Sequence, residues 1–280
     1  MNDLPVGASA ADPLSSFARN VMSQDGEDGI LAEILRRIGP GSRWCDELGA
    51  WDGKRLSNTY SLWHDQGWAA VLIEGSPKRF EDLRASTAAC PRVIPVCQFA
   101  GWEGEHALEN LLLAAGAPTD LDVLSVDIDS NDYYLFRSLS RLRPRVLVIE
   151  YNPTIPPHID VVQPAGGKPR LGASARALVR LAHEKGYALA SCTSTNLIFV
   201  RQEDFPRLGF GEPRLEDVFN PGHLTYLIAS MDGRYFLSAP PPFGEIRLPF
   251  HKRVERLFRS LLRRPGLPGL ERVECYTVRQ

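Results

Sequence analysis

Short hydrophobic runs alternate with amphipathic stretches along most of this chain. The spacing of apolar residues over 30–38 predicts an amphipathic helix, which the glycines and proline at 39–41 end. Five strand signals, each followed by a helical pattern, and two adjacent strand signals come next. The strands are expected at 44–48, 70–74, 93–97, 123–129, 146–150, 187–192 and 196–200, and the helices near 57–66, 77–86, 104–115, 132–141 and 173–185. This order predicts an α/β fold with a mostly parallel seven-stranded sheet, helices on both faces and an antiparallel hairpin at one edge.

The pattern also divides the chain. Residues 1–20 lack periodicity and predict a flexible N-terminal arm, residues 21–202 predict the α/β domain, and residues 203–280 predict a C-terminal extension. Near 250–264 the extension has an amphipathic helical pattern with basic residues away from its apolar face. We expect that face to pack on the domain or on a second subunit, as in a homodimer; contact with an anionic membrane surface is the alternative.

Composition limits the classes of function. The chain has 280 residues, of which 44% are hydrophobic and 24% charged, enough for a full core in one large domain or one domain with a subdomain. The net charge of −2 argues against a general nucleic-acid binder. The five cysteines show no Cys-x-x-Cys spacing, which favours reduced, buried thiols over disulfides or zinc. With neither an export signal nor a membrane span in the pattern, we expect a cytoplasmic protein.

Two strand ends carry candidate chemistry. Residues 43–53, RWCDELGAWDG, form a strand that ends in an acid and a glycine-rich turn, and the strand at 70–74 ends in Glu74. Glu74 is placed where Rossmann-like units bind a ribose diol. The turn has Asp52 between Gly49 and Gly53 and lacks Gly-x-Gly-x-x-Gly, so it suits a cationic ligand without phosphate, such as S-adenosylmethionine. The alternative is an ordinary strand-turn-helix connection with capping side chains.

A second group of oxygen-bearing side chains is expected at the same sheet edge. Strand periodicity places Asp127 and Asp129 on one side, and two further pairs follow at strand ends. The full group is Asp127, Asp129, Asn131, Asp132, Glu150 and Asn152. Three interpretations stay open: a magnesium site made by Asp127, Asp129 and Glu150, an acid/base and substrate-binding cluster that includes Asn131, Asp132 and Asn152, or helix capping.

Methyl transfer to a hydroxyl needs a group that removes a proton, whereas a carboxylate acceptor needs none. Asp127 or Asp129 would orient or deprotonate the hydroxyl. His158, in the proline-rich segment 151–172, is a second candidate base, with an exposed loop histidine as the alternative. The length of that segment indicates a functional loop rather than a linker.

Several segments in order resemble the FkbM-like S-adenosylmethionine-dependent methyltransferases. They are residues 23–29, 47–53 with 57–59, 72–75, 126–133 and 148–152, with Gly186-Tyr187 and 196–200 matching the last helix and terminal hairpin of that family. The resemblance covers about residues 21–202 and implies a class I methyltransferase fold. Members O-methylate sugars, polyketides and other small metabolites, and some methylate carboxylates.

The resemblance also implies roles for individual residues. Glu47, Gly49 and Gly53 would hold the methionine part, Glu74 the ribose, and Phe99 and Trp102 the adenine, while Gln24 and Asp25 would close over the cofactor. Asp52, Asn58 and Gly75 belong to the same predicted cofactor site. Two segments depart from the usual family pattern, at 51–52 and 129–132, so the chain resembles a divergent branch.

Three hypotheses follow. The leading one is an S-adenosylmethionine-dependent O-methyltransferase that acts on a hydroxyl or carboxylate of a small metabolite, a natural product or sugar. The second is a metal-assisted glycan O-methyltransferase with Asp127, Asp129 and Glu150 around magnesium. The third is a non-catalytic partner protein that keeps the cofactor pocket and docks through residues 250–264.

Overall fold

The computed structural model describes residues 12–39, 41–128, 130–166, 171–229, 231 and 235–243. These residues fall into two units, Met1–Asn220 and Pro221–Gln280. The first unit extends beyond the predicted boundary at residue 202, because η3 (Phe205–Leu208) places Phe205 and Leu208 in the hydrophobic core. The amphipathic helix predicted over 250–264 lies outside the described residues.

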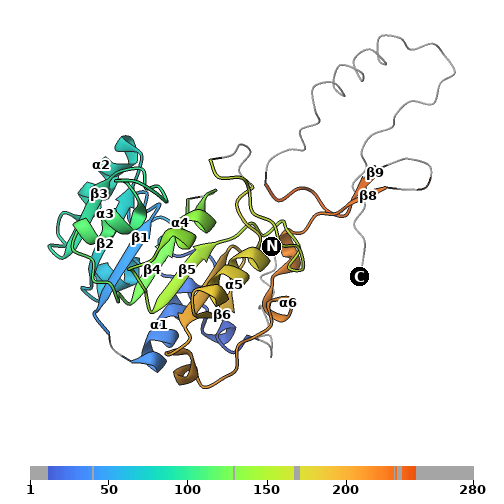
Figure 1. The fold of residues 1–280 in the computed structure, drawn as a ribbon, viewed down its shortest axis with the longest axis horizontal. Helices are drawn as coiled ribbons and strands as arrows, with labels where there is room; N and C mark the ends of the chain where they lie inside the picture. Colours follow the sequence, from blue (N-terminus) through green and yellow to red (C-terminus); the bar gives the residue numbers. More distant parts are fainter. Residues whose placement is uncertain are drawn as a thin grey trace, which may run out of the picture. The chain divides into compact units, whose positions relative to one another are not determined.

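A seven-stranded sheet with strand order β3-β2-β1-β4-β5-β7-β6 forms the centre of the first unit (Figure 1). Its strands are β1 (Trp44–Leu48), β2 (Ala69–Glu74), β3 (Val93–Cys97), β4 (Val123–Val126), β5 (Val146–Glu150), β6 (Tyr187–Cys192) and β7 (Asn196–Arg201). The first five strands are parallel, and β7 runs antiparallel to both β5 and β6. This is the predicted Rossmann-like fold of class I methyltransferases, including the antiparallel terminal hairpin.

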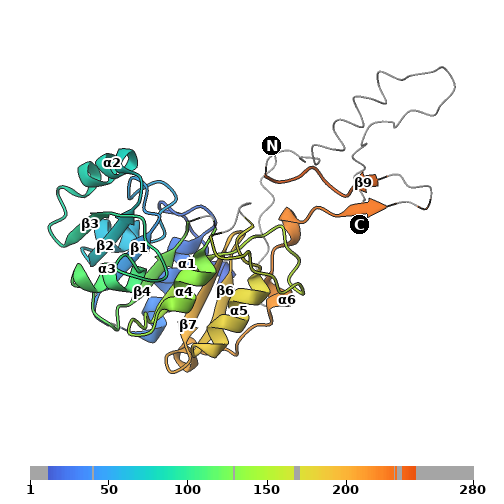
Figure 2. The ribbon, with the colours of Figure 1, turned by 45° about the horizontal axis from the view of Figure 1, so that its top comes forward.

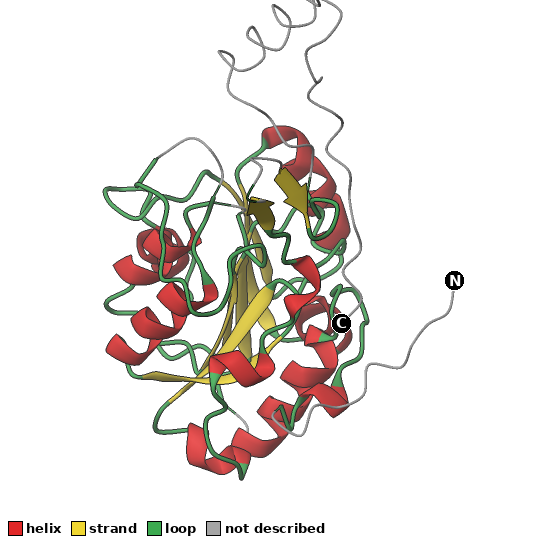
Figure 3. Ribbon diagram, turned by 90° about the vertical axis from the view of Figure 1, so that its right-hand side faces the viewer, coloured by secondary structure: helices red, strands yellow, loops and turns green. Residues whose placement is uncertain are grey.

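Helices cover both faces of this sheet (Figure 3). One face packs against α1 (Glu27–Ile38), the short η2 (Ser61–Asp65) and α2 (Pro77–Thr87), whose apolar residues share a core with alternate strand positions. The other face is covered by α3 (Leu108–Ala114), α4 (Asp132–Ser138) and α5 (Ala175–Glu184) (Figure 2). The central strands are buried on both sides, which explains why they read as continuous hydrophobic runs.

Several predicted elements are shorter than expected, and two of them are shortened by hydrogen bonds to carboxylate side chains. Instead of a helix over 57–66 there is one π turn, η2, because residues 57–59 bond to Glu47. Strand β4 ends at Val126 rather than at 129, because the Ile128 N–H is taken by the Asp132 carboxylate. Helix α3 begins only at Leu108, after a bridge between Gly101 and Ala107.

The end of the predicted flexible arm is packed against the domain. Leu14 has no exposed surface, and the Asp12 carboxylate accepts a hydrogen bond from Ser191 Oγ at 2.8 Å. Residues 15–17 form a short 3-10 helix, η1 (Ser15–Phe17). The expectation of a loose arm over 1–20 therefore does not hold for residues 12–20, since Leu14 and Asp12 are anchored in the first unit.

The second unit contains η4 (Pro221–His223) and an antiparallel pair, β8 (Leu227–Ala229) with β9 (Tyr235–Leu237). The described part of the chain contains no helix with the length and apolar character needed to cross a bilayer. Cys45 and Cys192 are buried, as expected, whereas Cys97 is exposed because it ends the edge strand β3.

Candidate functional site

The direction in which the chain adds strands reverses between β1 and β4. From β1 the chain adds β2 and β3 on one side, and then crosses back to place β4 on the other. Open α/β sheets bind ligands at the carboxyl ends of the strands beside such a reversal. Here Leu48 pairs with Val126, and the Asp127 N–H donates to the Leu48 carbonyl at 3.2 Å. The tips of β1 and β4 therefore meet where a ligand site is expected.

The turn after β1 is packed closely between its neighbours. The backbone N–H groups of Gly49 and Ala50 both donate to the Ile73 carbonyl, at 3.0 and 3.1 Å. Gly49 has φ of 84°, and a Cβ there would lie 1.9 Å from the carbonyl oxygen of Asp127. Only glycine fits both the left-handed conformation and this close approach. Gly53, at the end of the turn, also has a positive φ, of 77°.

The buried carboxylate of Glu47 holds the segment that follows the turn. It accepts hydrogen bonds from Ser57 Oγ and Thr59 Oγ1, both at 2.6 Å, and from the Asn58 N–H at 3.0 Å. Burial raises the pKa of Glu47, against the lowering effect of these bonds. The Asn58 side chain donates to Ser125 Oγ at 3.1 Å and so links the segment to β4. Glu47 and Asn58 thus hold the segment after the turn against β1 and β4; direct contact with a cofactor stays a prediction.

Glu74 at the tip of β2 touches the glycine turn directly. Its carboxylate accepts from the Trp51 N–H at 3.0 Å and from the Ser76 N–H at 2.6 Å. Beside it the Phe99 ring, which is 72% exposed, lies so close to Gly75 that a Cβ there would be 2.4 Å from the ring. The predicted ribose carboxylate and one predicted adenine residue are therefore neighbours.

Two other predicted cofactor residues, Asp52 and Trp102, contact groups of the protein itself. The Asp52 carboxylate accepts from the N–H groups of Lys54 and Arg55, at 2.9 and 2.7 Å, which stabilises a local turn; no helix begins there. The Trp102 ring packs on Tyr134 of α4, with ring centroids 5.4 Å apart. Trp102 therefore lies beside α4, on the β4 side of the reversal.

The carboxylates that follow β4 have unequal surroundings. Asp127 is half-buried, and Asp129 lies outside the described residues. Asp132 is buried, and its two oxygens accept from the Ile128 and Ser130 N–H groups, at 2.8 and 3.0 Å. Burial, with a contribution from the charge of Asp127, raises the pKa of Asp132 to about 7. Asp132 shapes the loop, and Asp127 is the described carboxylate at the tip of β4.

Gln163 holds the loop after β5, and the sequence did not single it out. Its side chain is 1% exposed, donates to Asn131 Oδ1 at 3.0 Å, and accepts from the N–H groups of Leu171 and Gly172, both at 2.9 Å. Its carbonyl accepts from the Tyr134 hydroxyl at 2.7 Å. A glutamine in a polar, proline-rich segment carries no pattern that would identify it. Only the fold shows that it joins the loop to α4.

The remaining predicted acceptor residues lie around the same loop. Asn152 donates to the Leu171 carbonyl at 2.8 Å, and Glu150 is half-buried opposite Asn196 at the end of β5. His158 is exposed, in agreement with the alternative of a surface loop histidine.

The motif at 23–29 docks on the turn between β6 and β7. Gln24 donates to Thr195 Oγ1 at 2.9 Å, and the Thr195 carbonyl accepts from the Tyr151 N–H at the end of β5. Buried Glu27 anchors the motif by accepting from Thr193 Oγ1 at 2.6 Å. Gln24, and Asp25 next to it, are thereby held at the carboxyl edge of the sheet; their contact with a cofactor stays a prediction.

Among the residues that the structure describes, no group of three or more His, Cys, Asp or Glu side chains is arranged to hold a metal ion. The predicted magnesium ligands include Asp129, which is not described, so that assignment stays a prediction.

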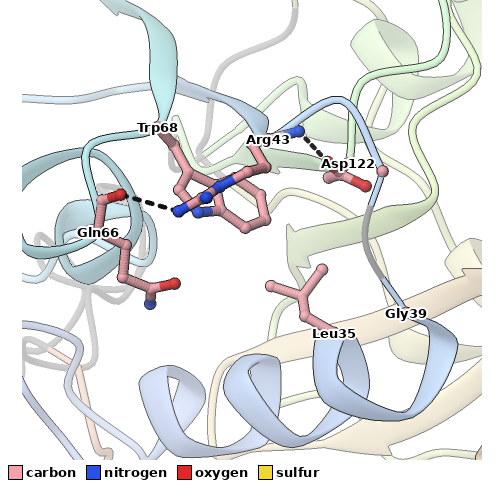
Figure 4. Close-up of a pocket in the computed structure, with 7 residues that line it drawn as sticks. Leu35, Gly39, Arg43, Gln66, Trp68 and Asp122 are labelled. Atoms are coloured by element: carbon pink, nitrogen blue, oxygen red, sulfur yellow. Dashed lines mark hydrogen bonds between the residues drawn. The ribbon is translucent and has the colours of Figure 1, made fainter.

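A cavity of about 180 Å³ lies at the opposite edge of the sheet (Figure 4). Three of its lining residues, Arg43, Trp68 and Asp122, each directly precede a parallel strand. It is therefore separate from the candidate site at the carboxyl edge.

No protein-family model and no curated protein matches this chain. Solved structures match weakly. The citrinin polyketide synthase CMeT domain is 13% identical with a TM-score of 0.42, and the aligned part covers 62% of this chain and 51% of that domain. The glycopeptide N-methyltransferase MtfA complexed with sinefungin is 14% identical with a TM-score of 0.38, covering 63% and 93%. A SAM dependent methyltransferase from Aquifex aeolicus is 11% identical with a TM-score of 0.37, covering 60% and 87%.

This chain thus spans about half the length of the first of these structures. Similarities at these levels carry no argument about activity. What defines the structural class of the chain is its own strand order, with five parallel strands and the antiparallel β7.

Proposed function

We propose that this protein is an S-adenosylmethionine-dependent methyltransferase that transfers the methyl group to an oxygen of a small metabolite. One observation carries the proposal: the glycine turn of β1, the carboxylate of Glu74 on β2 and Asp127 on β4 meet at the strand reversal. The resemblance of the sequence motifs to FkbM-like enzymes supports it. The acceptor would be a hydroxyl or a carboxylate of a natural product or a sugar.

The described residues fit the three parts of the cofactor. Glu74 can accept hydrogen bonds from a ribose diol with the lone pairs that Trp51 and Ser76 leave free. The exposed Phe99 ring beside Gly75 offers a face for adenine stacking. Burial raises the pKa values of both Glu47 and Asp132, and the negative charge of Asp127 adds to both shifts. That negative potential would favour a ligand with a sulfonium and an ammonium group.

When bound, the cofactor would supply an electrophilic methyl group. The chain itself would orient the acceptor and remove its proton. Asp127 is half-buried at the tip of β4 and would accept a proton from a hydroxyl acceptor. Asn131 and Asn152, held through the loop by Gln163 and Leu171, would position the acceptor. His158 as a second base remains a prediction from the sequence.

Isothermal titration of S-adenosylmethionine and S-adenosylhomocysteine tests the proposal. Phe99→Ala should weaken binding about tenfold through loss of base stacking. Its effect on stability should be small, because the ring is 72% exposed. Phe243→Ala, which removes a ring that is 60% exposed in the second unit, is the matched control and should bind like the wild type.

Glu74→Ala should also weaken binding, by about 1–3 kcal/mol. Because the substitution also removes the acceptor of two backbone N–H groups, its unfolding curve must be measured beside its affinity. Wild-type protein that binds neither compound would refute the methyltransferase proposal. Repeating the titration with magnesium and with a chelator tests whether Asp127, Asp129 and Glu150 hold a metal.

A further inference from the structure

A cluster of cations surrounds Trp51 in the turn after β1. The guanidinium carbon of Arg55 lies 4.7 Å from the centroid of the Trp51 ring, and that of Arg79 lies 4.1 Å from it. Lys54 and Lys78, each next to one of these arginines in the chain, are exposed. We call these five residues the Trp51 cluster. It adjoins the candidate cofactor site, because the Trp51 N–H donates to the Glu74 carboxylate.

Two carboxylates adjoin this cluster, but Asp52 and Glu74 accept from its backbone N–H groups rather than from its cationic side chains. Neither arginine and neither lysine of the cluster forms a salt bridge with a described residue, and two guanidinium groups share one indole ring. One turn further along α2, by contrast, Arg84 pairs with Glu81 at 2.6 Å. Like charges brought this close repel each other, so an anion between them would be favourable.

The backbone adds to the positive potential. Lys78 and Arg79 occupy the first turn of α2, which contains no acidic residue, and the Ser76 side chain does not cap the helix. The N-terminal end of a helix carries a partial positive charge, so cations at this position are unfavourable in the absence of an anion. Helix stability alone would favour acidic residues, rather than Lys78 and Arg79, in this first turn.

Trp51 itself has an uncommon conformation. Its φ is 48°, in the left-handed region where glycine or asparagine would be expected. The indole in return provides a flat face on which guanidinium groups stack, which leaves their N–H groups free to bind an oxyanion. Departures from local rules of this kind concentrate at functional sites.

We propose that the Trp51 cluster binds an oxyanion, a phosphate or a carboxylate, carried by the acceptor molecule. Arg55 and Arg79 are its donors and Trp51 is the platform that orients them. The acceptor is then an acidic metabolite, an assignment that rests on the proposed function, whereas the anion site itself does not. The site around Glu74 and Asp127 then holds the cationic cofactor, and the Trp51 cluster beside it holds the anionic group of the acceptor.

Titration with inorganic phosphate and, separately, with acetate tests this inference and distinguishes the two anions. The readout is tryptophan fluorescence, assigned by its loss in Trp51→Phe, with and without saturating S-adenosylhomocysteine. The double variant Arg55→Gln/Arg79→Gln should bind the preferred anion about tenfold more weakly. The control Arg84→Gln/Arg92→Gln removes the same charge from exposed arginines outside the cluster and should bind like the wild type.

Each outcome decides a separate point. Equal losses in the two double variants would overturn the site, since general electrostatics would then explain binding. Absence of saturable binding at millimolar anion would also overturn it. Competition between phosphate and S-adenosylhomocysteine would show that the two ligands share one site, and would refute a separate anion site beside the cofactor. Phosphate binding without any S-adenosylhomocysteine binding would refute the proposed function and leave the anion site supported.

Discussion

The candidate site has two halves: in the first, at the tips of β1 and β2, close backbone packing adds to the side-chain bonds of Glu47 and Glu74, whereas in the second, after β4 and β5, side-chain hydrogen bonds hold the loops. In the first half, the amides of Gly49 and Ala50 share one carbonyl, and the backbone of Gly49 touches that of Asp127. In the second half, the side chains of Asp132 and Gln163 hold the loops in place. Substitution of a side chain should therefore alter the backbone shape of the second half more readily than that of the first.

This difference matches two demands on the proposed enzyme. A backbone turn without room for a Cβ keeps its shape in every relative that keeps the glycine, which suits a cofactor that does not vary. A loop held by individual side chains can be reshaped by few substitutions, which suits an acceptor that varies. The predictions below test whether the two halves respond as differently as their construction implies.

The largest expected effect is in the first half. Gly49→Ala should lower the free energy of unfolding by about 4 kcal/mol, from the positive φ together with a Cβ that overlaps its neighbour. In the native structure that Cβ would lie 1.9 Å from the Asp127 carbonyl oxygen. Urea unfolding measures the loss.

Gly67→Ala separates the two causes. Gly67 has φ of 66°, and a Cβ there meets nothing within 4 Å. Its cost should be about 1 kcal/mol, from backbone strain alone. If the two variants lose the same stability, the close approach of Gly49 to Asp127 contributes nothing.

In the second half of the site, removal of a single polar side chain, that of Gln163, should lower the stability. Gln163→Ala leaves the Leu171 and Gly172 N–H groups and Asn131 Oδ1 without their buried partner. We expect a loss of about 3 kcal/mol. Hydrogen exchange at Leu171 and Gly172 should accelerate, while exchange at Gly49 and Ala50 should stay unchanged.

Gln202→Ala, at an exposed site, is the control and should change stability by less than about 0.5 kcal/mol. Faster exchange at Gly49 in Gln163→Ala would show that the two halves open together, and the comparison between them would then fail.

The same contrast explains how far the sequence predicted the molecule. The strands β1, β2, β3 and β5 were predicted within one residue, because buried parallel strands give continuous apolar runs. The mostly parallel seven-stranded sheet and its antiparallel terminal hairpin were confirmed as well. Local periodicity was sufficient there because those elements depend on their own pattern and on burial.

Prediction was wrong where a side chain outside the local hydrophobic pattern accepts a hydrogen bond from a backbone N–H. Glu47 prevents a helix at 57–59, and Asp132 ends β4 early by accepting from Ile128. Gln163 was missed because its partner, Asn131, lies 32 residues away and no periodicity connects them. All three contacts lie at the candidate site; that of Glu47 belongs to the first half, and those of Asp132 and Gln163 belong to the second.

The smallest expected effect concerns a pH dependence in the second half. The pKa of Asp132 is raised from 3.8 to about 7, so between these values the unfolded chain is ionised while the folded protein keeps the proton. The folded state binds more protons there, and stability falls as pH rises. One such group gives a slope of about 1.4 kcal/mol per pH unit. Asp132→Asn should remove that slope from unfolding curves measured between pH 4.5 and 6.5.

Asp46 of β1 provides the matched case in the first half. Burial raises its pKa to about 7 as well, and the charge of Asp127 is absent from the causes of that shift. Asp46→Asn should therefore remove a similar slope. Asp127→Asn distinguishes the two carboxylates, because it should lower the pKa of Asp132 and leave that of Asp46 unchanged. If both pKa values move together, the charge of Asp127 acts on Asp46 as well as on Glu47 at the tip of β1, and the distinction between the two carboxylates fails.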